Sequence, residues 1–234
     1  MARVLVVFSS VFGANAQLAE LTEAALTSVG AQARVRRVRE IVMDDVVRPE
    51  AAEAEVVSAD DLAWADGIVL TSPSHTGLPS ASVKAFIDEH HDSAVHGAFL
   101  NKTFAAMATS GFAHAGQERV VDSLNAVGAA WGCVLVPPST ADPTINKLDG
   151  NPFGLSFVLS HGRLPNSEVA AEVLREYFRR FTAVTEALEP LRAAASPGRA
   201  PRPVADGATG PASAEATGVR QPAHDPTTIA DQLN

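Results

Sequence analysis

The spacing of hydrophobic residues predicts strands that alternate with helices along most of the chain. Continuous apolar runs, typical of strands buried on both faces, occupy residues 3–8, 67–72, 103–110 and 133–137. Residues 33–38 instead alternate polar and apolar positions, which indicates a strand at the more exposed edge of a sheet. The pattern therefore predicts five strands.

Between these runs, apolar residues recur every three or four positions, as they do on the buried face of a helix. Three such stripes are Leu18, Leu21, Ala25 and Val29; Val120, Leu124, Val127 and Trp131; and Ala170, Leu174, Tyr177, Phe181, Val184 and Leu188. Ser80 is placed to cap a helix over residues 81–91, and Ser58 to cap a short helix ahead of Trp64.

Strands that alternate with helices form a parallel sheet with helices on both faces. Because the crossover connections are right-handed, few strand orders are possible, and the doubly wound order 2-1-3-4-5 is the best match for five strands. The predicted fold is therefore an α/β, flavodoxin-like domain built on a five-stranded parallel sheet.

One connection is much longer than the others. Residues 138–165 exceed an ordinary loop, and connections of this length are usually either functional or disordered. This one contains Phe153, Phe157 and Leu159, which are apolar groups that can pack against the domain. We therefore predict that the connection is ordered.

The composition changes after Leu188. Seven of the 15 prolines lie between Pro190 and Asn234, and no aromatic residue does. A segment of this kind buries too little apolar area to offset the entropy lost on ordering. We therefore predict a flavodoxin-like domain over residues 1–189 and a disordered tail over residues 190–234.

Charge and cysteine content exclude several classes of function. The 234 residues carry a net charge of -9, so the basic clusters of nucleic-acid-binding proteins are not expected. Cys133 is the one cysteine, which excludes an internal disulfide or a CxxC pair and favours a reducing cytosol. No apolar run is long enough to cross a bilayer, and the N-terminus lacks the features of a secretory signal. We expect a soluble, cytoplasmic protein with no nucleic-acid and no membrane partner.

The carboxyl ends of the predicted strands are followed by three loops, at residues 9–16, 72–80 and 109–118. In a doubly wound sheet, ligands bind at this edge. The first loop opens a helix, whose exposed N–H groups and dipole favour an anion, while Ser9, Ser10 and Asn15 add polar side chains. The alternative is an ordinary polar turn with a serine cap.

The first loop lacks several phosphate-binding motifs, and their absence narrows the kind of anion that it can bind. It contains neither the GxxxxGK[ST] pattern nor GxGxxG, which disfavours a nucleoside triphosphate or a Rossmann dinucleotide, and it has no lysine or arginine. A monophosphate held by neutral donors fits better. FMN is the monophosphate cofactor of this fold type, so we expect an FMN site.

Several motifs resemble one family, the flavodoxin-fold NAD(P)H:quinone oxidoreductases of the tryptophan-repressor-binding-protein A (WrbA) type. The resemblance covers residues 2–188. It includes S-x-x-G at Ser10 and Gly13, the second loop SPSHTG, and the Gly-Gln-Glu that closes the third loop. The most specific piece is GNPFG at residues 150–154, followed by HGRLPNSEV.

The resemblance implies an FMN-dependent enzyme with NADH or NADPH as electron donor and a small quinone-like substrate, assembled as a homo-oligomer, either a dimer or a tetramer. It implies that three groups of residues bind the cofactor: Ser9, Ser10, Val11, Phe12, Gly13, Ala14 and Asn15; Pro73, Ser74, His75, Thr76 and Gly77; and Ser110, Gly111, Phe112, Ala113 and Gly116. The first group would bind the phosphate, and the other two the ribityl chain and the ring.

The sequence departs from the family at positions near the expected substrate pocket. His75 replaces an arginine, Thr76 replaces an aromatic residue, and His114 interrupts a run of glycines. Trp131 stands where the family has a histidine, so it either lines the pocket or packs in the core. Together with Phe112, residues His75, His114 and Trp131 are the pocket candidates.

These observations leave three hypotheses for function. The first is an enzyme that passes two electrons from NAD(P)H through FMN to a quinone or a similar flat aromatic acceptor. The second is a flavodoxin-type electron carrier without substrate turnover of its own. The third is a flavin-binding interaction protein whose tail recruits a partner. The histidines and carboxylates of residues 88–96 lie at a predicted helix end and are not expected to bind a metal.

Overall fold

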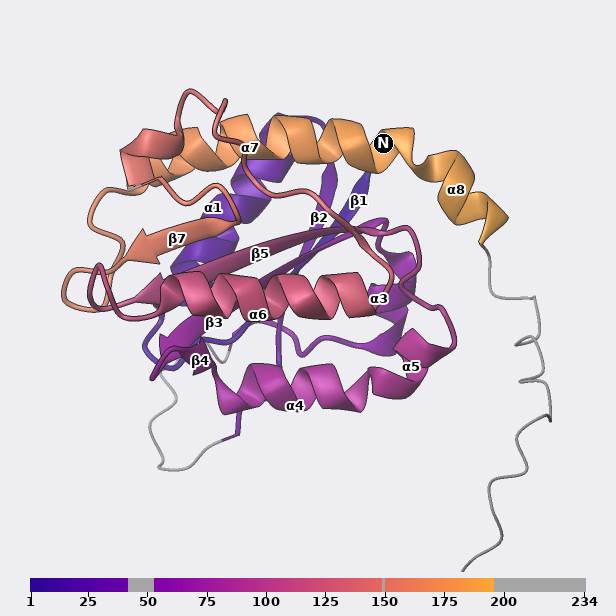
Figure 1. Cartoon of the computed structure of the whole chain (residues 1–234), viewed down its shortest axis with the longest axis horizontal. Coiled ribbons are helices and arrows are strands. Elements are labelled where there is room, and N and C mark those ends of the chain that lie inside the picture. The colour runs from indigo at the N-terminus through magenta and orange to yellow at the C-terminus, as the bar shows by residue number, and fades with distance from the viewer. Residues whose placement is uncertain (42–52, 149, 196–234) are drawn as a thin grey trace, which may run out of the picture. The chain divides into compact units, whose positions relative to one another are not determined.

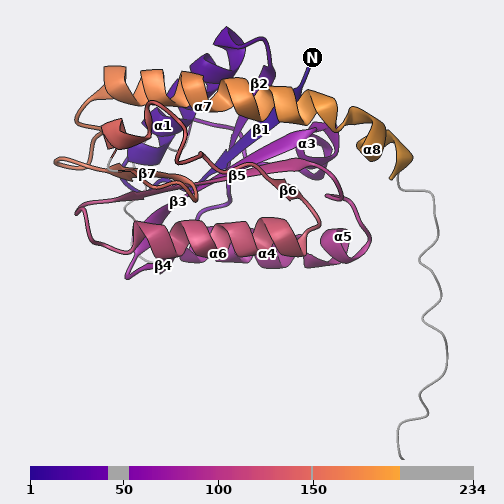
Figure 2. The same ribbon diagram turned by 45° about the horizontal axis from the view of Figure 1, so that its top comes forward.

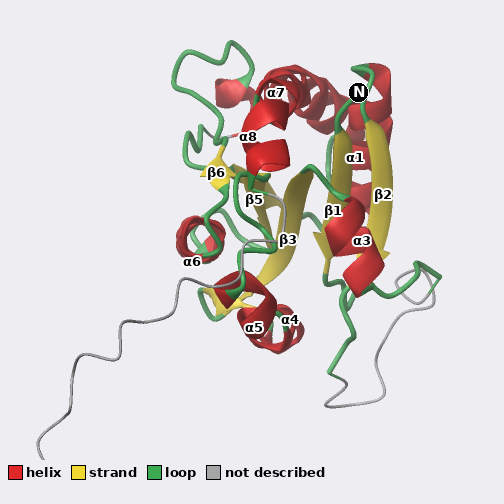
Figure 3. Ribbon diagram, turned by 90° about the vertical axis from the view of Figure 1, so that its right-hand side faces the viewer, coloured by secondary structure: helices red, strands yellow, loops and turns green. Residues whose placement is uncertain are grey.

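A computed structural model describes residues 1–41, 53–148 and 150–195, all of which belong to one compact unit. Its centre is a mainly parallel sheet in the order β2-β1-β3-β5-β6, with β4 added to β3 and β7 added to β5 (Figures 1 and 3). The strands are β1 (Arg3–Phe8), β2 (Gln32–Arg37), β3 (Gly67–His75), β4 (Leu78–Pro79), β5 (Thr103–Ser110), β6 (Val134–Leu135) and β7 (Leu155–Val158). The five strands of the main path have the predicted order 2-1-3-4-5 when numbered along the chain, which confirms the order, whereas the predicted number of strands was too small because the sheet has seven among the described residues.

Helices cover both faces of the sheet (Figure 2). They are α1 (Ala14–Ser28), α3 (Ala59–Trp64), α4 (Ala81–Glu89), α5 (His91–Val95), α6 (Gln117–Ala130), α7 (Ser167–Ala187) and α8 (Glu189–Ala194), together with the 3-10 turn η1 (Ile145–Leu148). Residues of α1 and α7 pack on Val4, Val6 and Phe8 of one face. Those of α3, α4 and α6 pack on Leu5 and Val7 of the other. Because β1 is apolar at every position after Arg3, it can be buried on both faces.

The two predicted serine caps are present. The Ser58 hydroxyl accepts from the backbone N–H of Asp61, whose carboxylate accepts in return from the Ser58 N–H, so α3 begins with a complete capping box. Ser80 accepts from the backbone N–H of Val83 at the start of α4. These caps fix the first residues of α3 and α4. The cap at Ser80 also marks the end of the second loop.

The position of the fifth strand is shared by two short strands. β6 pairs only with Thr103 and Phe104 at the start of β5. β7 pairs with Met107 to Ser110 at its end. The prediction of one strand over residues 133–137 was therefore too long, and the predicted connection over residues 138–165 contains a core strand. Pro137 has no backbone N–H to continue the ladder, so the chain leaves the sheet and returns at Leu155.

The second predicted loop is largely a β-hairpin. Strand β3 continues to His75, and β4 pairs antiparallel with its end, Ser74 opposite Pro79 and His75 opposite Leu78. The turn residues Thr76 and Gly77 both have positive φ, 53° and 80°. Positive φ at both turn positions suits the twist of a two-residue hairpin. The hairpin projects the strand end beyond the sheet toward the candidate site.

The boundary predicted at residue 189 also differs from the structure. Residues 189–194 form α8, with Pro190 in its first turn, where a missing N–H costs nothing. Its Arg192 donates to the backbone oxygen of Thr185 and lies 3.5 Å from Asp66, which attaches this helix to the domain. The prediction of disorder is therefore wrong for residues 190–194, and the part of it that concerns residues 196–234 lies outside the described residues.

Candidate functional site

The three loops predicted to form the site follow β1, β3 and β5, which are neighbours in the sheet. Strands β1 and β3 pair in parallel, as do β3 and β5, so the ends of all three lie at one edge. Ser80 Oγ donates to Ser9 Oγ at 3.0 Å, which joins the second loop to the first. The structure therefore brings the predicted cofactor-binding segments together.

The first loop turns sharply into α1 at Gly13. This residue has φ 89°, in the left-handed region that glycine adopts without a steric cost, and no side chain caps the helix there. The backbone N–H of Gly13 donates to Ser10 Oγ at 3.1 Å. Asn15 is buried, and its Nδ2 donates to the Ser9 oxygen at 2.8 Å. These bonds fix the loop around an open helix start.

Donors and acceptors remain available in this loop. Five backbone N–H groups have no acceptor within the described ranges, namely those of Val11, Phe12, Ala14, Asn15 and Ala16. The buried oxygens Asn15 Oδ1 and Thr71 Oγ1 likewise have no partner there. Buried polar groups are normally hydrogen-bonded, so such a cluster indicates a ligand or water. N–H groups suit a phosphate, and the two oxygens suit hydroxyl donors. The loop therefore fits a phosphate linked to a polyol chain.

The second and third loops are in direct backbone contact. A Cβ atom on Gly116 would lie 2.6 Å from the Cα atom of Gly77, so only glycine allows this approach. Ser74 Oγ also donates to the backbone oxygen of Ala115 at 2.7 Å. The hairpin and the third loop are thus held as one surface.

Gln117 organises the inside of the third loop. Its Nε2 donates to the Ala113 oxygen at 2.6 Å, and its Oε1 accepts from the Ala115 N–H at 3.2 Å. Ser110 Oγ donates to the Phe112 oxygen at 2.6 Å and lies 3.0 Å from Gln117 Oε1. Gln117 is buried, so the first residue of α6 shapes the loop from inside through these hydrogen bonds.

The pocket candidates fall in two places. His75, Phe112 and His114 are exposed at the edge where the loops meet, and the Phe112 side chain is 77% exposed. Trp131 is only 5% exposed and stacks on Phe99, with ring centroids 4.3 Å apart. It follows the C-terminus of α6, whereas the loops adjoin the N-terminus of that helix. The structure supports the core interpretation of Trp131.

Sequence reasoning missed two charged residues beside the first loop. The turn from Ser160 to Arg163 closes through reciprocal backbone hydrogen bonds, with positive φ at His161 and Gly162. His161 and Arg163 thereby line a hollow of about 340 Å³ together with Phe12 and other residues of the first loop and α1. The second is Glu40, whose carboxylate accepts from the Ser10 N–H at 2.9 Å. Both come from segments distant in sequence, and neither was assigned to the site, although Arg163 lies within the HGRLPNSEV motif of the resemblance.

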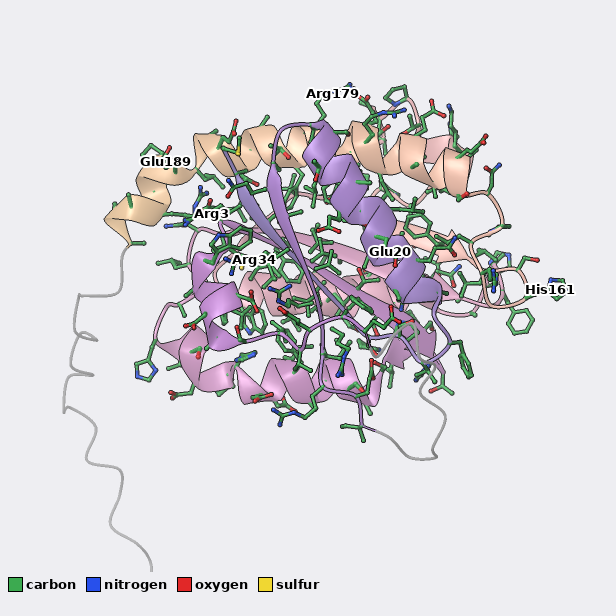
Figure 4. The ribbon with its side chains drawn as sticks, turned by 180° about the vertical axis from the view of Figure 1, so that it is seen from behind. Arg3, Glu20, Arg34, His161, Arg179 and Glu189 are labelled. Carbon is green, nitrogen blue, oxygen red and sulfur yellow. The ribbon has the colours of Figure 1, made fainter. Side chains whose placement is uncertain are left out.

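A separate hollow of about 450 Å³ lies at the opposite edge of the sheet. Its lining includes Arg3, Asp66, Lys102 and Glu189, which begin or directly precede strands or belong to α8. Figure 4 shows Arg3 and Glu189 toward one end of the molecule and His161 at the other. This hollow is not part of the candidate site.

Lys102 is the buried cation of that distant hollow. Its Nζ donates to the backbone oxygens of Leu62 and Ala65, at the C-terminus of α3. Burial lowers the pKa of Lys102 from 10.5 to about 8, because the charged form loses solvation. Burial also raises the pKa of the Cys133 thiol from 9.0 to about 12.

We expect the free energy of unfolding to rise by about 1 kcal/mol between pH 7.5 and 9. In this range the unfolded Lys102 side chain binds more protons than the folded one, so raising the pH favours folding. Above pH 9 the unfolded Cys133 thiol ionises while the folded thiol does not, which offsets the Lys102 contribution, so stability levels off and falls only above about pH 10. Urea unfolding at several pH values measures this. The rise should vanish in Lys102→Met and persist in Lys84→Met, which changes an exposed lysine; a rise retained in Lys102→Met would contradict the assignment.

No helix within residues 1–41, 53–148 and 150–195 is both long and apolar enough to cross a membrane. The sequence model of the family described as NADPH-dependent FMN reductase matches residues 2–146. An NAD(P)H dehydrogenase (quinone) of Deinococcus radiodurans is 31% identical over 195 residues, which cover 80% of this chain and 96% of the relative. One of the same name from Geotalea daltonii is 31% identical over 169 residues, covering 67% of this chain and 82% of the relative.

Solved structures show the fold. A flavodoxin, WrbA-like protein from Agrobacterium tumefaciens superposes with a TM-score of 0.55 at 16% identity, covering 81% of this chain and all of the other. Oxidised flavodoxin 2 from Bacillus cereus gives a TM-score of 0.51 at 17% identity, covering 80% and 99%. The chain therefore has the flavodoxin-like fold that its sequence predicts.

Proposed function

The chain belongs to the family of NADPH-dependent FMN reductases, and we propose from that premise that it passes two electrons from NAD(P)H to a quinone or a similar flat aromatic acceptor. When bound, FMN supplies the redox chemistry, and the protein supplies position and electrostatics. The observation that carries the proposal is the set of five N–H groups without acceptors at the start of α1.

The first loop would hold the phosphate of FMN. The N–H groups of Val11, Phe12, Ala14, Asn15 and Ala16 point from a helix start, where partial positive charge favours an anion. Arg163, beside the same loop, would add the cation that residues 9–16 lack. The orphaned oxygen of Asn15 would accept from a hydroxyl of the ribityl chain.

The hairpin and the third loop would hold the ring. Pro73 to Gly77 and Ser110 to Gly116 present backbone groups at one edge, and fixed donors there would stabilise negative charge that develops on the ring. Phe112 is exposed and available to stack on a flat ring, and His75 and His114 are available to donate to a substrate oxygen.

We also propose that the enzyme acts in the cytoplasm as a homo-oligomer. A cytoplasmic location agrees with the single thiol, Cys133, which is partly buried and reduced. Assembly agrees with the exposed apolar side chains Phe12 and Phe112 on the first and third loops, Leu78 on β4, and Phe153 in the connection that follows β6. Sedimentation at several protein concentrations tests the assembly.

A spectrum of the purified, FMN-loaded protein tests the function. We expect flavin absorbance that bleaches on addition of NADPH or NADH and returns on addition of benzoquinone. Steady turnover of both substrates supports the enzyme over an electron carrier. If neither nucleotide reduces the bound flavin, the enzyme hypothesis fails and the electron-carrier hypothesis remains. If the protein does not bind FMN, both hypotheses fail.

A further inference from the structure

A carboxylate lies against the base of the loop that would bind an anion. Glu40 follows β2, and its Oε1 accepts from the backbone N–H of Ser10 at 2.9 Å. Its Oε2 accepts from Ser9 Oγ at 3.1 Å. Both serines are buried, with exposures of 0% and 2%. A negative charge at this place would repel a phosphate. A carboxylate found here must therefore have another role in the site that offsets the repulsion.

The carboxylate ends a row of hydrogen bonds that spans the site. Ser80 Oγ donates to Ser9 Oγ at 3.0 Å, and Ser9 Oγ donates on to Glu40. The Ser80 N–H donates to Ser72 Oγ at 2.9 Å, at the point where β3 enters the hairpin. The hydroxyl protons of Ser80 and Ser9 are both directed toward the carboxylate, so the charge of Glu40 orients these two hydroxyls.

The segment that carries Glu40 is itself attached at both sides. The Val38 N–H donates to the Phe8 oxygen at 2.8 Å, and the Ile41 N–H donates to Ser82 Oγ at 2.9 Å. Glu40 is thus held between β1 and α4 and offers a fixed point for the Ser9–Ser10 peptide. Charge-assisted hydrogen bonds to backbone N–H groups are among the stronger ones in proteins.

Glu40 accepts from the Ser10 N–H of the loop and leaves several of the following N–H groups open. It takes the Ser10 N–H, while those of Val11, Phe12 and Ala14 have no acceptor among the residues described. A chain that is fixed at Ser10 must present the next N–H groups toward α1. We propose that Glu40 is the positioning residue of the phosphate loop, acting through Ser9 and Ser10, and that it sets the affinity for the phosphate of FMN. This inference rests on the proposed function.

The experiment compares FMN with riboflavin, which has the same ring and polyol but no phosphate. Fluorescence quenching gives both dissociation constants for wild type, Glu40→Ala, Glu40→Gln and Glu23→Ala, the last removing an exposed carboxylate from α1 as the matched charge control. For Glu40→Ala we expect FMN binding at least tenfold weaker and riboflavin binding within twofold of wild type. Glu40→Gln should recover most of the affinity, because its amide oxygen still accepts from the Ser10 N–H.

Three outcomes would overturn the inference. The first is equal FMN affinity in Glu40→Ala and wild type, and the second is an equal loss of affinity for FMN and for riboflavin. The third is tighter FMN binding in both Glu40 variants, which would mean that the charge of Glu40 only repels the phosphate. Amide hydrogen exchange of Ser10 and Gly13 in flavin-free protein gives a second readout, because their N–H groups donate to Glu40 and to Ser10 Oγ. We expect faster exchange at these two amides in Glu40→Ala only. If wild type shows slow exchange that depends on Glu40 yet binds no FMN, the proposed function fails while the loop positioning stands.

Discussion

Replacing Gly116 by alanine is expected to weaken FMN binding and quinone turnover at least tenfold. The new Cβ atom would meet the Cα atom of Gly77 at 2.6 Å, and backbone cannot rotate away as a side chain can. Gly116 also has φ 82°, a conformation that costs alanine about 1 to 2 kcal/mol. The hairpin and the third loop must therefore separate, and the surface proposed to hold the ring opens. A tenfold loss corresponds to about 1.4 kcal/mol of binding free energy.

The control for this variant has the same kind of backbone strain without the contact. Gly30 follows the C-terminal end of α1 and has φ 85°, but a Cβ atom there meets nothing within 4 Å. Gly30→Ala should therefore bind FMN within about twofold of wild type, since its strain arises away from the three loops. FMN titration and turnover with benzoquinone measure both variants. Equal behaviour of Gly116→Ala and Gly30→Ala would show that the contact between the two loops does not shape the site.

Replacing Phe157 by alanine is expected to lower the free energy of unfolding by about 3 to 5 kcal/mol, the usual cost of removing a buried phenylalanine ring. Phe157 lies on β7, is 2% exposed and belongs to the core cluster that contains Met107, Leu164 and Phe178. Its loss leaves a cavity under the sheet, which neighbours anchored on strands can fill only in part. Urea unfolding gives the free energy and the slope together.

Phe153 provides the comparison, four residues earlier in the same connection. Its ring is 64% exposed, and the hydrogen bonds to Asn125 and Asn151 come from its backbone, which alanine keeps. Phe153→Ala should therefore change stability by less than about 0.5 kcal/mol. A small effect at Phe157 would mean that β7 is not part of the core in solution. A large effect at Phe153 would mean that its ring is covered, as assembly would cover it.

The fold was predictable because the apolar patterns that specify its strands and helices are local and recur along the chain. The runs at residues 3–8, 67–72 and 103–110 are apolar on both faces, and the helix stripes between them have a different period, so element type and order follow directly. The split of the fifth strand was not predictable. Residues 155–158 are too few to show a hydrophobic period, and they follow a proline and glycines, which are typical of a loop. Only pairing with Met107 to Ser110 identifies them as a strand.

The site was predictable in part for a related reason. The residues of the three loops follow strands, and the ends of parallel neighbours must meet, so Ser10, Gly13 and Gly77 could be placed at one edge. Glu40 and Arg163 could not, because each reaches the first loop through a turn whose direction depends on tertiary packing. Trp131 shows the converse limit, since its position relative to a family motif suggested a pocket while its own apolar stripe placed it in the core.

The excursion between β6 and β7 begins and ends beside the same strand, because both short strands pair with β5. Insertions or deletions at the exposed residues Thr140 and Ala141 would leave the ladder of β5 unchanged and would still deliver His161 and Arg163 to the same rim. The start of the excursion is accordingly a place where the chain can change in length at little cost to folding.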